Sequence, residues 1–231
     1  MQESSSAAEF RFYEELNDVL PAEHRKRPFV YTFRGSPTIK YVIEAIGVPH
    51  TEVDLILANG VSVAFDYRLQ AGDRVSVYPV FESFDIGPVT RLRPQPLRDP
   101  KFVCDVHLGK LAKRLRLLGF DVTYRNTATD SEIVETALAQ QRIILTQDRG
   151  MLKLKKVTHG YLVRSPHMPE QVVEVLQRFD LLSRIAPFSR CTLCNGLIRV
   201  VDKADVREKL PWRTRERYHE FFRCEACGQV Y

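Results

Sequence analysis

The fold is decided by the stretch that begins KFVCDVHLGKLAKRLRLLGFDV at residues 101–122 and ends RIILTQDRG at residues 142–150. Two short apolar runs within it, FVC and IILT, are each followed closely by an aspartate, Asp105 and Asp148. In an α/β sheet, the side chains just past the carboxyl ends of parallel strands converge on one crevice. We therefore predict that Asp105 and Asp148 meet at one edge of a sheet, together with Asp130 from the segment between them.

The periodicity of the surrounding residues supports such a sheet. A helix is predicted over 106–118, with apolar residues at every third or fourth position, and Gly119 ends it. Thr129 and Glu132 fit a capping box, which begins a second helix that reaches about residue 140. Strands that alternate with helices predict a parallel sheet flanked by helices. The other predicted elements are strands 102–104, 122–124, 142–146 and 161–163 and a closing helix 169–179.

The three aspartates suit a divalent-metal site. Clustered carboxylates repel one another unless a cation neutralises them. Mg²⁺ and Mn²⁺ prefer oxygen ligands, and a water polarised by such an ion can attack a phosphodiester bond. Three basic residues near the aspartates, Lys110, Arg114 and Arg149, could hold the phosphates of the strand being cut.

Each of these residues also has a purely structural interpretation. Asp105 could cap the helix that follows it, Asp130 could be a first-turn acid favoured by the helix dipole, and Asp148 could be a turn residue. The basic side chains of the helix 106–118 could form an ordinary solvated face. The combination favours function, because two of the acids end apolar strands and the third opens a neighbouring helix.

Composition and charge indicate a globular protein with a basic middle segment. Of its 231 residues 44% are hydrophobic and 27% are charged, which is ordinary, and the length allows two to three small domains. Residues 1–100 carry 11 Lys and Arg against 14 Asp and Glu, residues 101–187 carry 14 against 9, and residues 188–231 carry 9 against 6. A polyanionic partner should therefore bind the middle segment rather than the N-terminal one.

No run of about 18 apolar residues occurs, and the polar start MQESSSAAEF lacks the order of a signal peptide. We therefore expect a cytoplasmic protein that has no membrane partner.

Four of the five cysteines form two CxxC pairs, Cys191 with Cys194 and Cys224 with Cys227, with 29 residues between them. Each pair aims two sulfurs at one point, and two such turns supply the tetrahedral set that Zn²⁺ prefers. Because all four positions are filled, we predict a structural zinc site in a ribbon over 188–231, in preference to disulfides or redox chemistry.

The insert between the two pairs mixes arginines with aromatic residues, in the sequence KLPWRTRERYHEFFR over 209–223. Such a mixture can stack on single-stranded RNA and grip its phosphates. The aromatic side chains could instead only pack the ribbon, an interpretation that we favour slightly, and both stay open for Trp212, Tyr218, Phe221 and Phe222.

Residues 9–84 show the order strand, strand, helix, strand, strand, strand, which resembles the β-grasp or ubiquitin-like fold. The residues GVPHTEVDLILANG at 47–60 and LQAGDRVSVYP at 69–79 resemble ubiquitin-like modules related to sulfur carriers. No diglycine follows Pro79, so docking or substrate handling is predicted in place of sulfur transfer. His50 is interpreted as a structural loop residue in preference to a catalytic one.

The sequence also predicts the boundaries of the helix, the strands, the tail and the linker in residues 1–100. A helix over 38–45 should have its N-cap at Ser36 and end at Gly47. Residues 1–8 are predicted to form a disordered tail, and the proline-containing segment 85–100 is predicted to be an extended linker. The predicted strands are 10–13, 29–33, 53–57, 61–65 and 74–79.

The motifs DVHLGKLAKRLRLLGFDV and TQDRG, each after an apolar strand, resemble the PIN-like ribonuclease domain of the Mut-seven C-terminal type. In bacterial members of that family, this domain follows a ubiquitin-like module and ends in a zinc ribbon. The resemblance implies a PIN-like nuclease domain over 101–187, with Asp105, Asp130 and Asp148 as the metal-binding acids. PIN sites often use a fourth acid, for which the closing helix offers Glu170 and Glu174.

These observations predict an α/β protein that is a ribonuclease dependent on Mg²⁺ or Mn²⁺ and hydrolyses RNA at the aspartate cluster. Transfer RNA and ribosomal RNA are candidate targets, and the ubiquitin-like domain is a candidate site for a protein partner. The main alternative is a non-catalytic RNA-binding or ribosome-associated zinc-ribbon protein. A further alternative is a ubiquitin-like adaptor that retains an inactive nuclease domain.

Overall fold

The computed structural model describes residues 5–79, 90–92 and 100–231. The chain forms two compact units. The first contains Met1–Asp99 together with Asp148–Tyr161, and the second contains Pro100–Gln147 together with Leu162–Tyr231. Within the described part of the chain, no helix is long and apolar enough to cross a membrane.

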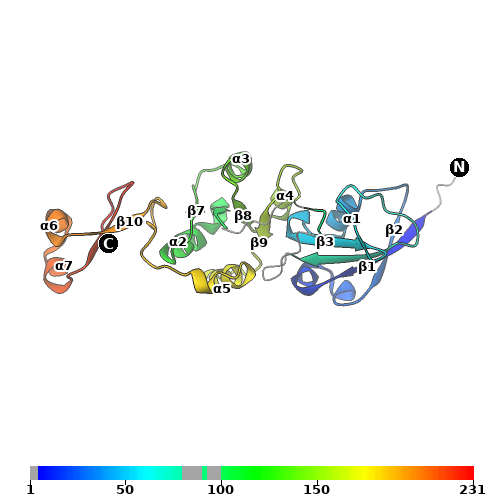
Figure 1. Ribbon diagram of the computed structural model, residues 1–231, viewed down its shortest axis with the longest axis horizontal. Helices are drawn as coiled ribbons and strands as arrows, with labels where there is room; N and C mark the ends of the chain where they lie inside the picture. The colour runs from blue at the N-terminus through cyan, green and yellow to red at the C-terminus, as the bar shows by residue number, and fades with distance from the viewer. Residues whose placement is uncertain (1–4, 80–89, 93–99) are drawn as a thin grey trace. The chain divides into compact units, whose positions relative to one another are not determined.

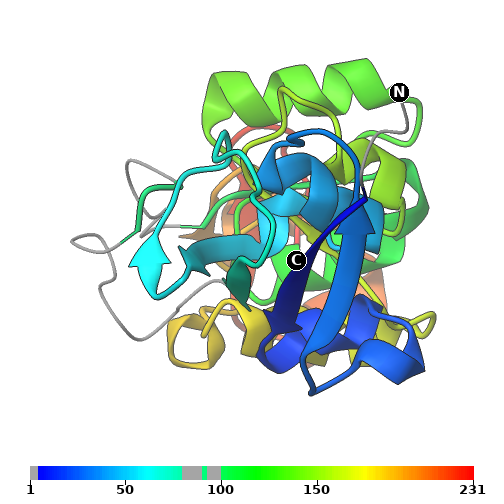
Figure 2. The same cartoon turned by 90° about the vertical axis from the view of Figure 1, so that its right-hand side faces the viewer.

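The first unit is built on a five-stranded mixed sheet with the strand order β2-β1-β5-β3-β4, and α1 lies over it (Figures 1 and 2). Strands β1 and β5 are parallel and the other neighbours are antiparallel. This is the predicted β-grasp arrangement. Its elements are β1 Ser6–Phe12, β2 Phe29–Phe33, α1 Ile39–Ile46, β3 Val53–Ala58, β4 Val61–Ser62 and β5 Arg74–Pro79, with short 3-10 helices η1 Glu14–Val19, η2 Ala22–His24 and η3 His50–Glu52.

Helix α1 begins and ends where its capping chemistry requires. The hydroxyl of Thr38 accepts a hydrogen bond from the backbone N–H of Tyr41, so Thr38 is the N-cap and not the predicted Ser36. Gly47 ends the helix with a φ of 120°, a conformation that favours glycine. Ile39, Val42 and Ile43 form the buried face of the helix.

The prediction of a disordered tail over residues 1–8 is wrong at its end. Strand β1 begins at Ser6, because residues 6–10 pair with β2 and Ala8 is buried in the sheet. Strand β4 is also shorter than the predicted 61–65. Except for residues 90–92 and 100, the predicted linker 85–100 lies outside the described residues.

A four-stranded sheet has the order β7-β6-β8-β9, in which β6 pairs in parallel with both β7 and β8. Strands β7, β6 and β8 belong to the second unit. The chain runs from the central β6 to β7 on one side and then to β8 on the other, so the topological switch point lies between β6 and β8. The strands are β6 Phe102–Cys104, β7 Val122–Thr123, β8 Ile143–Thr146 and β9 Gly160–Leu162.

Helices follow these strands much as predicted (Figure 1). The predicted helix 106–118 consists of a 3-10 turn and α2, and its buried side includes Leu108, Leu111 and Leu115. One short helix, α4, was not predicted, since four residues are too few to show a period. The helices are η4 Val106–Leu108, α2 Gly109–Leu117, α3 Asp130–Gln140, α4 Arg149–Leu152 and α5 Met168–Arg178, followed by η5 Leu182–Arg184.

The C-terminal part of the second unit is a two-stranded antiparallel hairpin with an insert at its far end. Val206, Leu210 and Phe221 form a small core there, against which Val201 and Val230 pack. The elements are β10 Ile198–Val201, α6 Lys203–Val206, η6 Arg207–Lys209, α7 Trp212–Arg217 and β11 Phe221–Cys224.

Candidate active site and metal centre

Asp105 lies at the topological switch point of the parallel sheet. It follows β6 directly, and its backbone N–H donates to the carbonyl of Leu145 on β8 at 3.0 Å. The hydroxyl of Thr146, the last residue of β8, donates to Asp105 Oδ2 at 2.7 Å, and both side chains are buried. Asp105 precedes η4, but its side chain makes no capping hydrogen bond there. The carboxylate is therefore oriented by the neighbouring strand and does not serve as a plain helix cap.

Asp130 is the exposed first residue of α3, and this helix follows β7. The capping of α3 is done by Thr129 and Glu132, which form the predicted capping box. Glu132 also pairs with Arg125. Hydrogen bonds from the backbone and hydroxyl of Thr129 and from Arg125 lower the pKa of Glu132 to about 2. Glu132 thus has a structural role, which leaves Asp130 as the acid of this turn without a capping function.

Asp148 stands two residues beyond β8 and is the N-cap of α4. Its Oδ1 accepts a hydrogen bond from the backbone N–H of Gly150 at 2.7 Å. Asp148 therefore has the structural role that the turn interpretation predicts, because it caps α4. Asp148 belongs to the first compact unit, whereas Asp105 and Asp130 belong to the second.

The predicted basic residues are exposed, as a phosphate-binding role requires. Lys110 and Arg114 lie on the exposed side of α2, and Arg149 is the exposed first residue of α4. Glu170 and Glu174, the candidates for a fourth acid, bind the loop before α5: Glu170 accepts from the hydroxyl of Ser165 at 2.6 Å, and Glu174 accepts from the backbone of Arg164 and Ser165.

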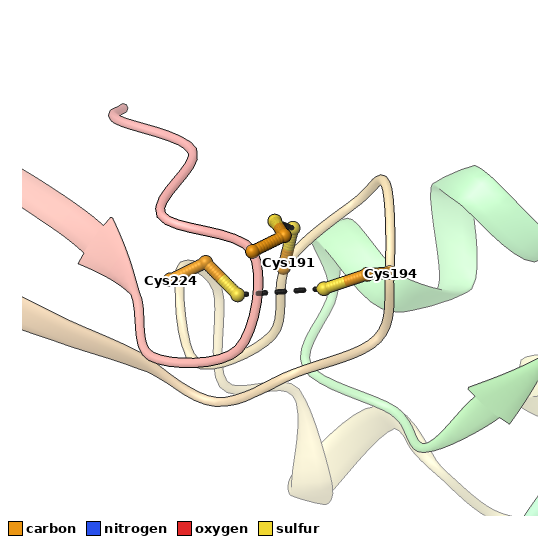
Figure 3. A group of neighbouring side chains, drawn as sticks. Cys191, Cys194 and Cys224 are labelled. Carbon is orange, nitrogen blue, oxygen red and sulfur yellow. Dashed lines mark hydrogen bonds between the residues drawn. The ribbon is translucent and has the colours of Figure 1, made fainter.

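The four cysteines converge on one point, and Figure 3 labels three of them, Cys191, Cys194 and Cys224. Their sulfurs all lie within 4.8 Å of one another, and across the described ranges theirs is the one group of three or more Cys, His, Asp or Glu side chains gathered this closely. The sulfurs of Cys194 and Cys224 are 3.4 Å apart, and those of Cys191 and Cys227 are 3.7 Å apart. A tetrahedral Zn²⁺ with Zn–S bonds of about 2.3 Å places its sulfurs about 3.8 Å apart. The donor set and its spacing therefore fit a zinc ribbon.

The surroundings of Cys191 stabilise its thiolate, whereas those of Cys194 favour the thiol. Burial raises the pKa of Cys191, but the hydroxyl of Tyr231 and the backbone N–H groups of Leu193 and Cys194 outweigh it and lower this pKa to about 6. Burial raises the pKa of Cys194 to about 12, and its contacts with the neighbouring thiols act in the same direction. Four sulfurs at this spacing cannot all ionise without a cation, so the cluster as a whole favours a bound metal.

Gly196 is required for the close approach of the two CxxC turns. A Cβ at this position would lie 2.8 Å from the Cβ of Ala226, 2.9 Å from the sulfur of Cys224 and 3.3 Å from that of Cys194. The glycine thus leaves room for the sulfurs, which explains the Asn-Gly sequence after the first pair.

Sequence reasoning missed the polar contacts that join the ribbon to the parallel sheet within the second unit. Arg116, which is buried on α2, donates to the carbonyls of Thr192 and Leu193 in the first CxxC turn at 3.2 and 2.9 Å. Asn195 donates to Asp121 at 2.8 Å and accepts from the backbone of Val122 at 2.9 Å. An arginine within an otherwise apolar helix face was the available signal, since a buried arginine needs acceptors.

The aromatic residues of the insert divide into two groups. Phe221 is buried in the small core, and Phe222 stacks on Phe188 with ring centroids 5.7 Å apart, so these two pack the ribbon. Trp212 and Tyr218 are 68% and 52% exposed, respectively. Each exposed ring lies beside a guanidinium group, Trp212 with Arg213 and Tyr218 with Arg217, at 5.4 and 5.8 Å.

Comparison with known families agrees with this architecture. A family model described as Mut7-C RNAse domain matches residues 100–231, which is more than half of the chain. The chain belongs to this Mut7-C RNAse family. A second model, Mut7-C ubiquitin, matches residues 5–85. The predicted family resemblance is therefore confirmed, with a ubiquitin-like module followed by the Mut7-C domain and its cysteine cluster.

Two solved structures are similar to part of the Mut7-C protein. The crystal structure of H. volcanii small archaeal modifier protein 1 shares 20% identity, with a TM-score of 0.27, over 33% of this chain and 99% of that one. The crystal structure of SAMP1 from Haloferax volcanii shares 17% identity, with the same TM-score, over 34% of this chain and 100% of that one. No curated protein matches the chain.

Proposed function

We propose that this Mut7-C protein is a ribonuclease that hydrolyses RNA phosphodiester bonds with Mg²⁺ or Mn²⁺ held by Asp105, Asp130 and Asp148. The observation that carries the proposal is the buried carboxylate of Asp105 at the switch point between β6 and β8, in a domain of the Mut7-C RNAse family. Ligands in open α/β sheets bind at this place, outside the carboxyl ends of the strands.

The order of the strands supports the set of three acids. Asp130, Asp105 and Asp148 follow β7, β6 and β8, which are neighbours in the sheet. Asp148 is two residues beyond Thr146, so the chain can carry its Cα no more than about 7 Å from that of Thr146. Thr146 itself holds Asp105. Hard carboxylate oxygens are the donors that suit Mg²⁺ and Mn²⁺.

The residues would divide the work as follows. Asp105, Asp130 and Asp148 would hold the divalent ion, which would supply a polarised water as nucleophile and would neutralise charge on the phosphate. Thr146 holds the carboxylate of Asp105 in one orientation, and Gly150 does the same for Asp148. Lys110, Arg114 and Arg149 would pair with phosphates of the bound strand, with RNA as the substrate class and transfer or ribosomal RNA as candidates.

The four cysteines would hold Zn²⁺ as a structural ion. Protein sulfur would fill all four tetrahedral positions around the ion and leave none for water or substrate. The ribbon would then add RNA affinity through the exposed pairs Trp212–Arg213 and Tyr218–Arg217. These pairs favour the second candidate function, an RNA-binding protein without cleavage.

An RNA cleavage and binding assay on the full chain separates the two functions. Asp105→Asn keeps an acceptor for Thr146 and Asp148→Asn keeps one for Gly150, so both variants should fold; Asp66→Asn, an exposed aspartate of the ubiquitin-like module, is the matched control. We expect cleavage with Mn²⁺ or Mg²⁺ to fall about 100-fold or more in the two site variants and to be unchanged in the control. Binding of Mn²⁺, measured by calorimetry, should weaken in parallel.

Equal cleavage by wild type and both site variants would refute the nuclease assignment. RNA binding without cleavage by any of the proteins would support the second function instead.

A further inference from the structure

The segment 148–161 belongs to the Mut7-C domain by sequence, yet it forms one compact unit with the ubiquitin-like module. It begins with Asp148 and contains α4, which at four residues is too short to be stable alone. After α4 the segment contains a turn in which the backbone N–H of Val157 donates to the carbonyl of Leu154. Met151, Leu152 and Val157 are nevertheless buried. The segment therefore depends on contacts from outside itself.

Three hydrogen bonds that converge on Glu44 and His50 supply such contacts. The Oε1 atom of Glu44 lies 2.6 Å from Nδ1 of His50. The other ring nitrogen of His50, Nε2, lies 2.8 Å from the carbonyl oxygen of Val157. The ammonium of Lys153 donates to the main-chain carbonyl of Glu44 at 2.8 Å. We call this set, Glu44, His50, Lys153 and the carbonyl of Val157, the Glu44 clasp.

The chemistry of the clasp makes it stronger than an ordinary loop contact. Both ring nitrogens of His50 lie within hydrogen-bond distance of an oxygen atom, and one of these oxygens belongs to the carboxylate of Glu44. Hydrogen bonds to a carboxylate are stronger than those between neutral groups. His50 is only 5% exposed, which shields these bonds from water. Lys153 places its charge at the last turn of α1, where the helix dipole favours a cation. These contacts agree with the predicted structural role of His50, which connects the ubiquitin-like module to the segment that carries Asp148.

We infer that the ubiquitin-like module is a positioning part of the nuclease: through the Glu44 clasp it holds the segment that presents Asp148 and Arg149 to metal and RNA. The expected effect of the clasp on metal binding and RNA cleavage rests on the proposed function. The clasp itself rests only on its hydrogen bonds. It gives the module a role that requires neither a diglycine tail nor RNA contact, in agreement with the acidic excess of residues 1–100. Glu44, His50 and Lys153 touch none of the reacting atoms in this role.

The test uses the full chain with the variants His50→Ala, Glu44→Gln and Lys153→Met, and Arg34→Ala as the control on an exposed position of the same module. We expect amide hydrogen exchange in residues 149–157 to become about tenfold faster or more in the clasp variants, while β1, β3 and β5 keep their protection. Mn²⁺ affinity and RNA cleavage should each fall about tenfold. The control should match the wild type in all three measurements.

The outcomes separate the inference from the proposed function. Unchanged exchange in 149–157 would overturn the clasp. Faster exchange with unchanged Mn²⁺ affinity and cleavage would overturn the positioning role while leaving the nuclease intact. A wild type that neither binds Mn²⁺ nor cleaves RNA would refute the proposed function and, with it, the positioning role; the exchange data would still decide whether the clasp exists.

Discussion

The four cysteines and the three aspartates Asp105, Asp130 and Asp148 are both candidate metal sites, but they are built in different ways. Each CxxC turn places two sulfurs by local geometry, and one hairpin brings the two turns together, so all four sulfurs lie within 4.8 Å. The three aspartates follow three different strands. Asp148 belongs to the first compact unit, and Asp105 and Asp130 belong to the second. A site made by short-range geometry is complete once its hairpin forms, whereas a site made by long-range topology depends on everything that positions its strands and loops.

Metal removal should show the largest difference between the two regions. If zinc holds the ribbon, a strong chelator at pH 7 should abolish hydrogen-exchange protection in β10 and β11, because structural zinc in small peptides contributes on the order of 10 kcal/mol. Strands β6 and β8 should keep their protection, since their core is apolar and contains no cysteine ligand. Exchange mass spectrometry of the full chain measures both regions at once. If β10 and β11 stay protected after the metal has been removed, the ribbon does not depend on zinc for its fold.

A smaller effect is expected from the junction between the ribbon and the parallel sheet. Burial alone would raise the pKa of Asp121, but hydrogen bonds from Arg142 and Asn195 and the charge of Arg190 hold it below the ordinary value. Asp121→Asn should therefore lower the free energy of unfolding at pH 7 by roughly 1–3 kcal/mol, because it leaves partly buried donors without their charged acceptor.

The pH dependence of this effect follows from the direction of the pKa shift. A lowered pKa in the folded state gives stability that is present above the unfolded pKa and is lost as the pH falls through the folded one. The difference between wild type and Asp121→Asn should thus shrink at acid pH. Denaturant unfolding between pH 7 and pH 3 measures the free energy of unfolding of both proteins. If their difference stays constant over this range, the charge of Asp121 does not contribute and the residue acts through packing alone.

The smallest effect should come from the exposed cap of α3. Glu132→Gln removes the charge that pairs with Arg125 and that binds the backbone of Thr129. Because its folded pKa of about 2 lies below the ordinary value of 4.5, the lost contribution is present above about pH 4.5 and disappears as the pH falls toward 2. We expect a drop in Tm of about 2 °C or less at pH 7, with RNA cleavage unchanged, since Glu132 caps a helix. A cleavage loss as large as that of Asp130→Asn would instead place Glu132 among the metal ligands.

The prediction of the fold succeeded where the signal was local. The apolar runs before Asp105 and Asp148, the capping box at Thr129 and the turn at Gly47 all lie where their residue types predict them. Predictions were wrong at positions decided by neighbours distant in sequence. Strand β1 starts at Ser6 because Phe33 of β2 pairs with it there. Helix α4 was missed for a different reason, since its four residues are too few to show a helical period.

The sequence by itself determined the family, the parallel α/β order and the four cysteines that cluster, because strand periods, CxxC spacing and caps each depend on a few consecutive residues. Only the tertiary structure decided that Thr146 orients Asp105, that Arg116 docks the first CxxC turn, and that His50 and Glu44 hold the segment beginning at Asp148. The partners in these contacts are between 41 and 109 residues apart, except the pair Glu44 and His50. No local pattern encodes such partners, since a buried polar group needs an acceptor or donor but its sequence does not say which one.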